Sequence, residues 1–329
     1  SYALGTSFGV VGTAGIVLMA LARSGGVSEA VTAGAVLSGA YFGDRCSPAS
    51  SSAALVAAET GTTLYDNLRN MFRTGVLPVA LTVIVYGVLS VRHPITAVDE
   101  SLLQALRDSA VISLWALLPA VIMLALPLVK VPVLISIALS VAAAGTVSVL
   151  VQGMTVWDML KTALLGYYPT AGQLKDILSG GGIVSMAKPA ALVFTTGLLA
   201  GLLEGTGVLK GAAGLVEKLA NRWGRFAASV AVSLGAGMIF CNQSVAIVMG
   251  NQLLRRCYTD HNEQAVDMEN SGIVLSALIP WNIACSIPLV MLEVNERAIP
   301  YAVLLYMIPL VYGLTKQWVY PAERQAMKE

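Results

Sequence analysis

The sequence contains little charge. Only 12% of its 329 residues are Asp, Glu, Lys or Arg, whereas soluble globular domains carry about 25%. The net charge is only +1, so no basic surface for nucleic acid is indicated. A large soluble helical protein is also disfavoured, because so few charged residues leave too little polar surface to cover it.

Cysteine and histidine are scarce as well. The four cysteines, Cys46, Cys241, Cys257 and Cys285, are dispersed and show no metal-ligand spacing, so we expect them to pack as small apolar residues. The two histidines fall in polar connecting segments. No metal site or cofactor is predicted. No nucleophile–base pair appears either, so we do not expect an enzyme.

Long uncharged apolar runs are abundant instead. The mean hydropathy is +0.74, and 56% of the residues are hydrophobic. A helix needs about 20 residues to cross a bilayer, so runs of this length predict an all-α polytopic membrane protein whose first partner is lipid. The runs are 1–22, 74–91, 110–129, 131–157, 226–254, 271–292 and 298–315.

Two polar connectors between the runs invite structural predictions. Segment 59–73 has Leu64, Leu68 and Met71 at helical spacing, which predicts a short interfacial helix. Segment 257–270 is the most polar connector of the chain. Because Lys and Arg occur in nearly all connectors, their distribution does not indicate an orientation in the membrane.

Several apolar stretches carry polar or helix-breaking residues near their middle. Run 226–254 would be about 44 Å long as one helix, and the sequence CNQS at 241–244 interrupts it. Freed backbone groups at membrane depth must find partners, and proline removes a donor, so such positions are expected to end helices. The helix breaks are expected at Gly5, Gly9, Gly43, Pro48 and Pro280.

The spacing of the breaks indicates internal repeats. Gly5 and Gly43 are 38 residues apart, and so are Asn242 and Pro280. Two structural repeats would produce this match, although one equal interval can also arise by chance. In many transporters such repeats are inverted, and their discontinuous helices meet at a substrate site near the midplane of the membrane.

We therefore predict two parts of the chain. Residues 1–109 form the remainder of a first repeat, with broken helices at 5–9 and 42–54. Residues 110–329 form a second repeat, with broken helices at 241–244 and 279–282. Fewer apolar elements precede Gly5 than Asn242, which predicts that an amino-terminal portion precedes this sequence.

Asp44 is the ionisable residue that most strongly suggests a function. It lies between two apolar pieces beside Pro48, and a charge at membrane depth is costly unless it serves a purpose. Such a carboxylate could bind a proton and a cation in turn. The alternative is a structural ion pair with Arg45. Glu204, at the end of run 189–203, is a second candidate for proton or cation coupling, or simply an interfacial carboxylate.

Hydroxyl and amide side chains around the breaks add neutral ligands for an ion or a solute. The alternative is that they only satisfy helix ends and close helix–helix contacts. The candidate binding residues are Thr6, Ser7, Ser47, Ser50, Ser51, Ser52, Asn242, Gln243, Ser244, Trp281 and Asn282.

These segments resemble the NhaC-type sodium/proton antiporters, a family within the wider ion-transporter superfamily. The resemblance is carried by GTSFGVVGT at 5–13, SGAYFGDR at 38–45, Ser47-Pro48, the surroundings of Gln243, and LIPWN at 278–282. It implies inverted repeats with broken helices and cation-coupled exchange. It also implies a longer amino-terminal part than this sequence has.

The chain departs from the family at two positions. Where the family often reads LSDTTN after Ser-Pro, this chain reads ASSSAA at 49–54. Where the family usually has Gly-Asp before Gln243, this chain has Cys241-Asn242. Two expected carboxylates are thus replaced, at Ser51 and Asn242, and a neutral cavity of this kind would suit an organic or zwitterionic solute.

Three functions follow. The first is a Na⁺/H⁺ antiporter of bacterial plasma-membrane type with Asp44 as the titrating group and alternating access at a midplane site. The second is a Na⁺- or H⁺-coupled carrier of an amino acid or small organic anion, whose carboxylate would bind at helix N-termini near Ser47 and Asn282. The third is a passive channel. The sequence leaves open whether the protein forms a homo-oligomer.

Overall fold

The computed structural model describes residues 1, 5–48, 50–92, 111, 113–128, 131, 133–168, 182–185, 187–206 and 213–319. The regular elements in these ranges are helices, so the all-α prediction is confirmed for the described part of the chain. They form two compact units. The first comprises 1–16, 29–93 and 191–329, and the second comprises 17–28 and 94–190.

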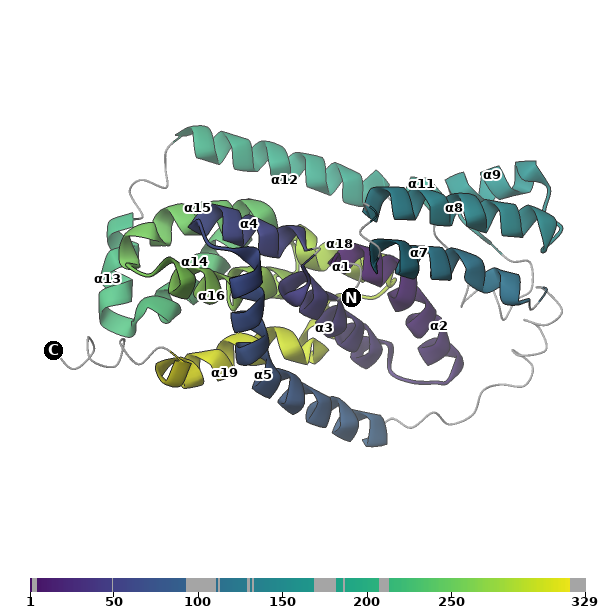
Figure 1. Cartoon of the computed structure of the whole chain (residues 1–329). Coiled ribbons are helices and arrows are strands. Elements are labelled where there is room, and N and C mark those ends of the chain that lie inside the picture. Colours follow the sequence, from purple (N-terminus) through teal and green to yellow (C-terminus); the bar gives the residue numbers. More distant parts are fainter. Residues whose placement is uncertain are drawn as a thin grey trace. The chain divides into compact units, whose positions relative to one another are not determined.

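The first unit holds most of the helices. Its elements are α1 (Ser7–Val10), the π-helix η1 (Val11–Gly15), α3 (Glu29–Cys46), α4 (Ser51–Thr60), α5 (Leu64–Arg92), α12 (Ala187–Thr206), α13 (Ala213–Trp223), α14 (Arg225–Phe240), α15 (Gln243–Leu254), η4 (Arg255–Cys257), α16 (His261–Glu269), α17 (Gly272–Leu275), η5 (Ser276–Leu278), α18 (Ile283–Met291), η6 (Glu296–Tyr301) and α19 (Val303–Val319). In this unit α14 lies beside α15 (Figure 1).

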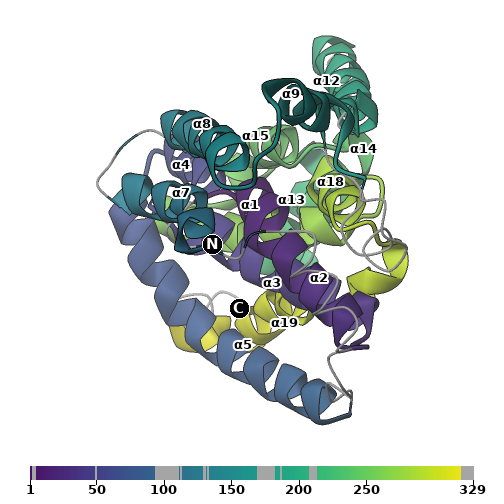
Figure 2. The same cartoon turned by 90° about the vertical axis from the view of Figure 1, so that its right-hand side faces the viewer.

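The second unit is smaller. Its elements are most of α2 (Ile16–Ser24), η2 (Leu114–Leu117), α7 (Leu118–Leu128), α8 (Val133–Leu150), α9 (Val156–Leu165) and α11 (Gly182–Ser185). Helices α7 and α8 pack side by side (Figure 2), and the Ser140 hydroxyl of α8 donates to the Pro119 carbonyl of α7 over 2.8 Å.

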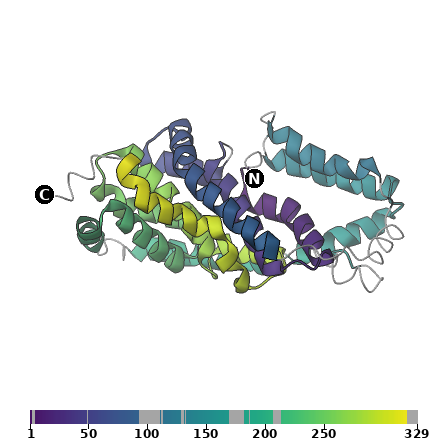
Figure 3. The same ribbon diagram turned by 90° about the horizontal axis from the view of Figure 1, so that it is seen from below.

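Helices α3, α5 and α19 pack together in the first unit. Figure 3 shows α5 and α19 lying side by side, and α3 packs on both. The Tyr86 hydroxyl of α5 donates to the Tyr301 carbonyl over 2.6 Å and lies 2.7 Å from the Ser38 hydroxyl of α3. A Cβ atom at Gly34 would lie 2.4 Å from the Tyr301 carbonyl carbon, so α3 and η6 approach too closely for a side chain there.

Helix α5 differs from the expectation of a separate interfacial helix at 59–73. It runs without interruption from Leu64 to Arg92, because the spacing of Leu64, Leu68 and Met71 stays in phase with the apolar run that follows. Among the described residues, α5 alone is long and apolar enough to cross a bilayer. The pair His261–Leu278 and Ile283–Met291, bent by 50°, would count as a second span.

Segment 257–270, expected to be a polar connector, is instead largely buried helix. It forms α16, whose Glu263, Asp267 and Glu269 are all buried. Glu263, Asp267 and Ser271 recur every four residues, which places them on one helical face. That face meets basic and hydroxyl groups from neighbouring helices, which is why so polar a stretch lies inside the unit.

The long apolar runs are divided into shorter helices at the polar positions. Helix α14 ends at Phe240 and α15 begins at Gln243, with Cys241 in the left-handed region at φ 54°. Helix α3 ends at Cys46, and α4 begins at Ser51. Pro48 and Pro280 both stand in turns.

The three glycines expected at helix breaks lie in different settings. Gly5 precedes α1 with φ 60°, a conformation that favours glycine. Gly9 lies inside α1 and Gly43 inside α3, so neither marks a helix end. At Gly43 the helix instead passes against Ser1, whose atoms would lie 2.4 Å from an added Cβ.

Candidate functional site

Four of the predicted binding residues cap the helices that follow the interruptions. Thr6, Ser50, Asn242 and Asn282 precede α1, α4, α15 and α18, respectively. Their side-chain oxygens accept hydrogen bonds from backbone amides of the first turn at distances between 2.9 and 3.4 Å. Capping of this kind satisfies donors that a helix N-terminus leaves open.

Two interruptions are joined directly to each other. The backbone amide of Ile283 donates to the Cys241 carbonyl over 2.9 Å. The Asn282 side chain donates to the Gly237 carbonyl over 2.8 Å, and the Trp281 indole donates to the Met238 carbonyl over 3.0 Å. The end of α14 and the start of α18 therefore satisfy each other's open backbone groups.

Asp44 lies where the α3–α4 interruption meets the start of α15. Its side chain is only 2% exposed. Oδ1 accepts from the Ser50 hydroxyl at 3.1 Å, and Oδ2 accepts from the Ser52 hydroxyl at 3.0 Å. Gln243 donates to Oδ2 over 3.2 Å and to the Ile273 carbonyl over 2.9 Å. The carboxylate thus links three helices through neutral groups.

A hydrogen bond from Tyr41 connects this region to α18. The Tyr41 hydroxyl donates to the Ala284 carbonyl over 2.5 Å, and both residues are buried. Ser7, another candidate binding residue, lies beside the same hydroxyl. Together with Gln243, this contact brings all the interruptions of the first unit into one region around Asp44.

Arg45 does not pair with Asp44. Its guanidinium donates to the Asn270 side chain at 2.6 Å, to the Thr74 hydroxyl at 2.8 Å and to the Met71 carbonyl at 3.0 Å. Consecutive helical residues point about 100° apart, so Asp44 and Arg45 face different neighbours. None of the ion pairs among the described residues includes Asp44.

The charge on Asp44 is therefore balanced by hydrogen bonds and by a helix end. Ser50 is the N-cap of α4 and Ser52 lies in its first turn, and the N-terminus of this helix carries a partial positive charge. A hydrogen bond to a charged group contributes about 1.5–3 kcal/mol. Such partners hold a carboxylate without neutralising it, so a proton or a small cation can still bind there.

The remaining candidate residues are not gathered at Asp44. Ser47 is buried in the turn after α3, whereas Ser51 and Ser244 are exposed. The Trp281 side chain is 52% exposed. The side chain of Glu204 lies outside the described part of the structure, so only its place in α12 is known.

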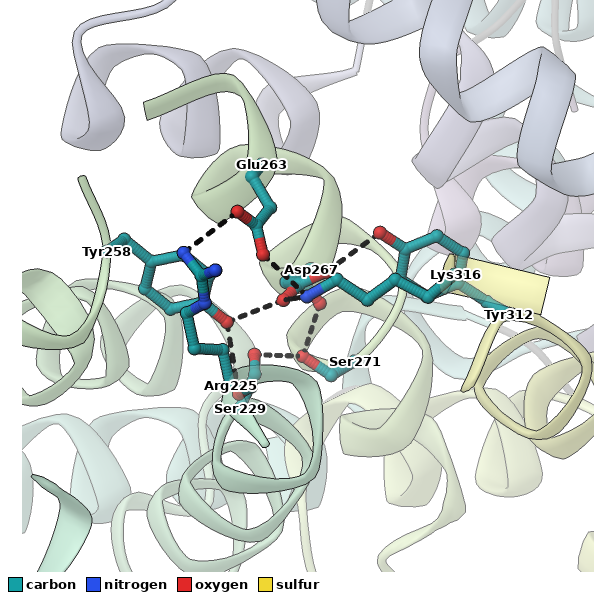
Figure 4. A network of polar contacts seen from close by, with 8 residues as sticks. All are labelled: Arg225, Ser229, Tyr258, Glu263, Asp267, Ser271, Tyr312 and Lys316. Atoms are coloured by element: carbon teal, nitrogen blue, oxygen red, sulfur yellow. Dashed lines mark hydrogen bonds and ion pairs between the residues drawn. The ribbon is translucent and has the colours of Figure 1, made fainter. Parts of the chain in front are cut away.

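A second polar centre, which the sequence did not predict, joins α14, α16 and α19. The Lys316 ammonium lies 2.6 Å from Asp267 and 2.8 Å from Glu263 (Figure 4). Arg225 pairs with the other oxygen of Glu263 at 3.1 Å. All of these side chains except Arg225 are almost completely buried.

Hydroxyl groups complete this charged network. Tyr258 and Tyr312 donate to the two oxygens of Asp267 at 2.6 and 2.8 Å, and Ser271 donates to its backbone carbonyl at 2.7 Å (Figure 4). Two acids and two bases balance in charge, and both oxygens of Asp267 have partners. The network therefore holds helices together and offers no obvious place for an ion.

Two signals in the sequence could have revealed this network. Glu263, Asp267 and Ser271 are four residues apart, and Lys316 is an isolated charge after a long apolar run. The polarity of segment 257–270 concealed both, because it is typical of a loop.

Comparisons with known proteins identify the family of the chain. The model of the Na⁺/H⁺ antiporter family matches residues 1–91 and 39–315. The chain is 29% identical to the malate-2H⁺/Na⁺-lactate antiporter of Bacillus subtilis, with 86% of this chain and 63% of that protein aligned. It is 26% identical to the Na⁺/H⁺ antiporter NhaC of the same species, with 94% and 71% aligned.

A relative from an archaeon is named for a different substrate. The arginine/ornithine antiporter ArcD of Halobacterium salinarum is 28% identical over 85% of this chain and 60% of its own length. No solved structure matches. The chain spans less than two thirds of the malate and arginine antiporters and somewhat more of NhaC.

The predicted resemblance to NhaC-type proteins is confirmed by the family model and by the NhaC relatives. The matched segments include Asp44, Gln243 and Asn282, the residues that connect the helix interruptions. The chain belongs to the Na⁺/H⁺ antiporter family, whose members are integral membrane proteins.

Proposed function

We propose that the protein exchanges Na⁺ for H⁺ by alternating access, with Asp44 binding the two ions in turn. The observation that carries this proposal is the surroundings of Asp44. It is buried, receives hydrogen bonds from Ser50, Ser52 and Gln243, and has no basic partner among the residues that the structure describes. A carboxylate held in this way keeps a net charge that either ion can neutralise.

The competition between the ions follows from the chemistry of the site. A proton on Asp44 removes the negative charge that attracts Na⁺, and bound Na⁺ occupies the oxygens that would take the proton. The serine hydroxyls can donate to the ionised carboxylate or turn their oxygen lone pairs toward a cation. One ion therefore leaves before the other binds, which is the requirement for exchange.

Inverted repeats are part of the proposal, and the order of elements supports them. After Thr6, the chain forms helices α1 to α2, then α3, an interruption, the short α4 and the long α5. After Asn242, it forms α15, then α16 to η5, an interruption, the short α18 and α19. We infer that these are corresponding discontinuous helices of two repeats that divide near residues 109 and 110.

An organic solute is the second candidate for the cargo. Two relatives are named for malate and lactate and for arginine and ornithine. The amide nitrogen of Asn242 and the hydroxyl of Ser7, near the interruptions, would suit such a solute better than a site with several carboxylates would. In this case Asp44 would bind the coupling ion. Because the named relatives come from bacteria and an archaeon, we place the protein in a plasma membrane of bacterial type.

The test is proton flux in proteoliposomes that contain the full-length protein and a fluorescent pH probe. We expect Na⁺ to drive proton movement in the wild type, and Asp44→Asn to abolish it. Asp66→Asn is the matched control, because it makes the same change at an exposed carboxylate of α5. Normal flux in Asp44→Asn would rule out Asp44 as the coupling group.

Addition of solutes separates the two cargoes. Flux with Na⁺ alone supports ion exchange. Flux that requires malate, lactate, arginine or ornithine supports the organic carrier. A flux that rises without saturation, and that needs no counter-ion, would indicate a channel.

A further inference from the structure

A second buried carboxyl group, Glu269, lies in the surroundings of Arg45. Glu269 is the last residue of α16 and is fully buried. Arg45 is the basic group that acts on it, and the Asn67 side chain of α5 lies beside it. None of the ion pairs among the described residues includes Glu269.

Polar atoms without hydrogen bonds are concentrated at this place. Neither carboxylate oxygen of Glu269 receives a hydrogen bond of good geometry, although the Asn67 side chain lies close enough to interact with it, and Asn67 Oδ1, Arg45 Nε and Asn270 Nδ2 lack one as well. Elsewhere in the described structure such buried side-chain atoms occur only at Glu263 and Ser286. Buried polar groups without partners are rare in native proteins and call for an explanation.

Rotation of the amides does not remove these open positions. Asn270 Oδ1 accepts from Arg45 at 2.6 Å, so its nitrogen must point elsewhere. Asn67 Nδ2 donates to the Thr62 hydroxyl at 2.8 Å. The Thr60 hydroxyl donates to the Val56 carbonyl, which leaves Thr62 to donate to Thr60 and to accept from Asn67.

We propose that Glu269 is a second proton-binding site, distinct from Asp44, and that its proton is one of those transported. The transport of this proton rests on the proposed function, whereas its binding to Glu269 does not. Protonation turns Glu269 from an anion with acceptors only into a neutral acid with one O–H donor. The proton comes from water on one side of the membrane, and the carboxylate is formed again when the proton leaves to the other side.

A proton fits this place better than a metal cation does. Sodium would need a shell of several oxygen ligands, and it would lie close to the positively charged Arg45. A proton needs a single acceptor, and the O–H group that it forms can donate to an acceptor without a partner such as Asn67 Oδ1. The Arg45 guanidinium then stabilises the carboxylate after the proton has left, because opposite charges attract strongly away from water.

The groups around Glu269 are few. Arg45 and the Cys46 thiol face it from α3, and the neutral Asn67 faces it from α5. Helices α4, α14, α15 and α17 also pack on α16, and their described residues add no charge at Glu269. Among these groups, Arg45 alone carries a charge that acts on Glu269.

Infrared spectroscopy of the purified full-length protein tests proton binding without any transport. We expect a carboxylic-acid C=O band that shifts in heavy water, is present in the wild type and in Asp44→Asn, and is missing in Glu269→Gln. Glu217→Gln, a partly exposed glutamate of α13, is the matched control and keeps the band. Glu269→Asp restores an acid and should restore a band. An unchanged band in folded Glu269→Gln would overturn the proposal.

Transport assays then test coupling. In Glu269→Gln we expect Na⁺-driven proton flux to fall by about tenfold or more, while exchange of radioactive Na⁺ for Na⁺ stays within about twofold. If Glu269 only balances the charge of Arg45, the double variant Arg45→Gln/Glu269→Gln would recover coupled flux, and the proposal would be overturned. A wild type without proton flux would instead refute the proposed function, and the infrared band would still decide whether Glu269 binds a proton.

Discussion

Asp267 and Asp44 are both buried aspartates of the same unit, but their surroundings differ. Asp267 lies against the Lys316 ammonium and receives two tyrosine hydroxyls. Asp44 receives two serine hydroxyls and one glutamine amide, and no base in the described part of the chain pairs with it. Burial alone therefore does not identify a transport residue. The partners of the carboxylate make the difference. A basic side chain neutralises its charge, whereas neutral donors leave that charge available to a mobile ion.

The largest expected effect is on the stability that the charged network around Asp267 provides. Lys316→Met leaves the buried Asp267 and Glu263 with Arg225 as the one remaining base of this network. Loss of one partner of a buried ion pair costs about 3–5 kcal/mol. We expect the unfolding midpoint in detergent to fall sharply. Lys218→Met, at an exposed position of α13, should leave it unchanged. Recovery of the unfolding midpoint in the double variant Lys316→Met/Asp267→Asn would confirm that the unpaired charge lowers it. Without recovery, lost packing would be the cause.

The same substitution at the two aspartates sharpens the comparison. Asp267→Asn leaves Lys316 with Glu263 as its remaining acid and should destabilise the protein by about 3 kcal/mol. Asp44→Asn keeps an oxygen for the serine donors and should cost only about 1 kcal/mol. Unfolding curves and proton flux measured on both variants should show opposite patterns: Asp267→Asn loses stability first, and Asp44→Asn loses flux at near-normal stability. Equal losses of stability would remove the distinction.

A smaller effect is expected where α14 meets the turn before α18. A Cβ atom at Gly237 would lie 2.7 Å from the Ile279 side chain and 3.7 Å from Asn282 Nδ2. Gly237→Ala should therefore shift this turn at a cost of about 1–3 kcal/mol and reduce exchange. Gly235→Ala is the matched control, because its Cβ would meet no atom within 4 Å. Normal exchange in Gly237→Ala would show that the turn adapts without affecting the site.

The smallest effects come from single hydroxyl groups. Ser52→Ala removes one donor to Asp44, and Tyr312→Phe removes one donor to Asp267, and one hydrogen bond contributes a net of about 0.5–1.5 kcal/mol. We expect Ser52→Ala to change the Na⁺ concentration for half-maximal flux, with little change in unfolding. Tyr312→Phe should lower the unfolding midpoint and leave that concentration unchanged. The reverse result would exchange the roles assigned to the two aspartates.

Much of the fold class could be predicted from the sequence, because long apolar runs and their polar interruptions are local features. Asp44 could be identified in the same way, as a charge inside an apolar stretch beside Pro48. The sequence could not show that Asn242 and Asn282 cap helices, since an amide at a break can bind either the backbone or a ligand. That choice depends on the path of the chain on both sides of the break.

The charged network and Glu269 could not be predicted by local reasoning. Lys316 meets Asp267 across 49 positions, and Arg45 meets Asn270 across 225. Segment 257–270 is polar and therefore resembles a loop in the sequence. Only the tertiary packing buries its acidic residues. Likewise, the buried face of α5 runs from Asn67 to Thr82, across the change from polar to apolar composition that suggests a helix boundary.

The side-by-side position of Asp44 and Arg45 on α3 has a genetic consequence. Because one turn of a stiff helix carries both residues, any rotation or shift of α3 changes the contacts of Asp44 with Ser52 and those of Arg45 with Asn270 together. Mutations at the two places should therefore not combine independently. Second-site suppressors of a defect at one of them are expected to arise around the other, and evolution would have to adjust the two sets of residues in step.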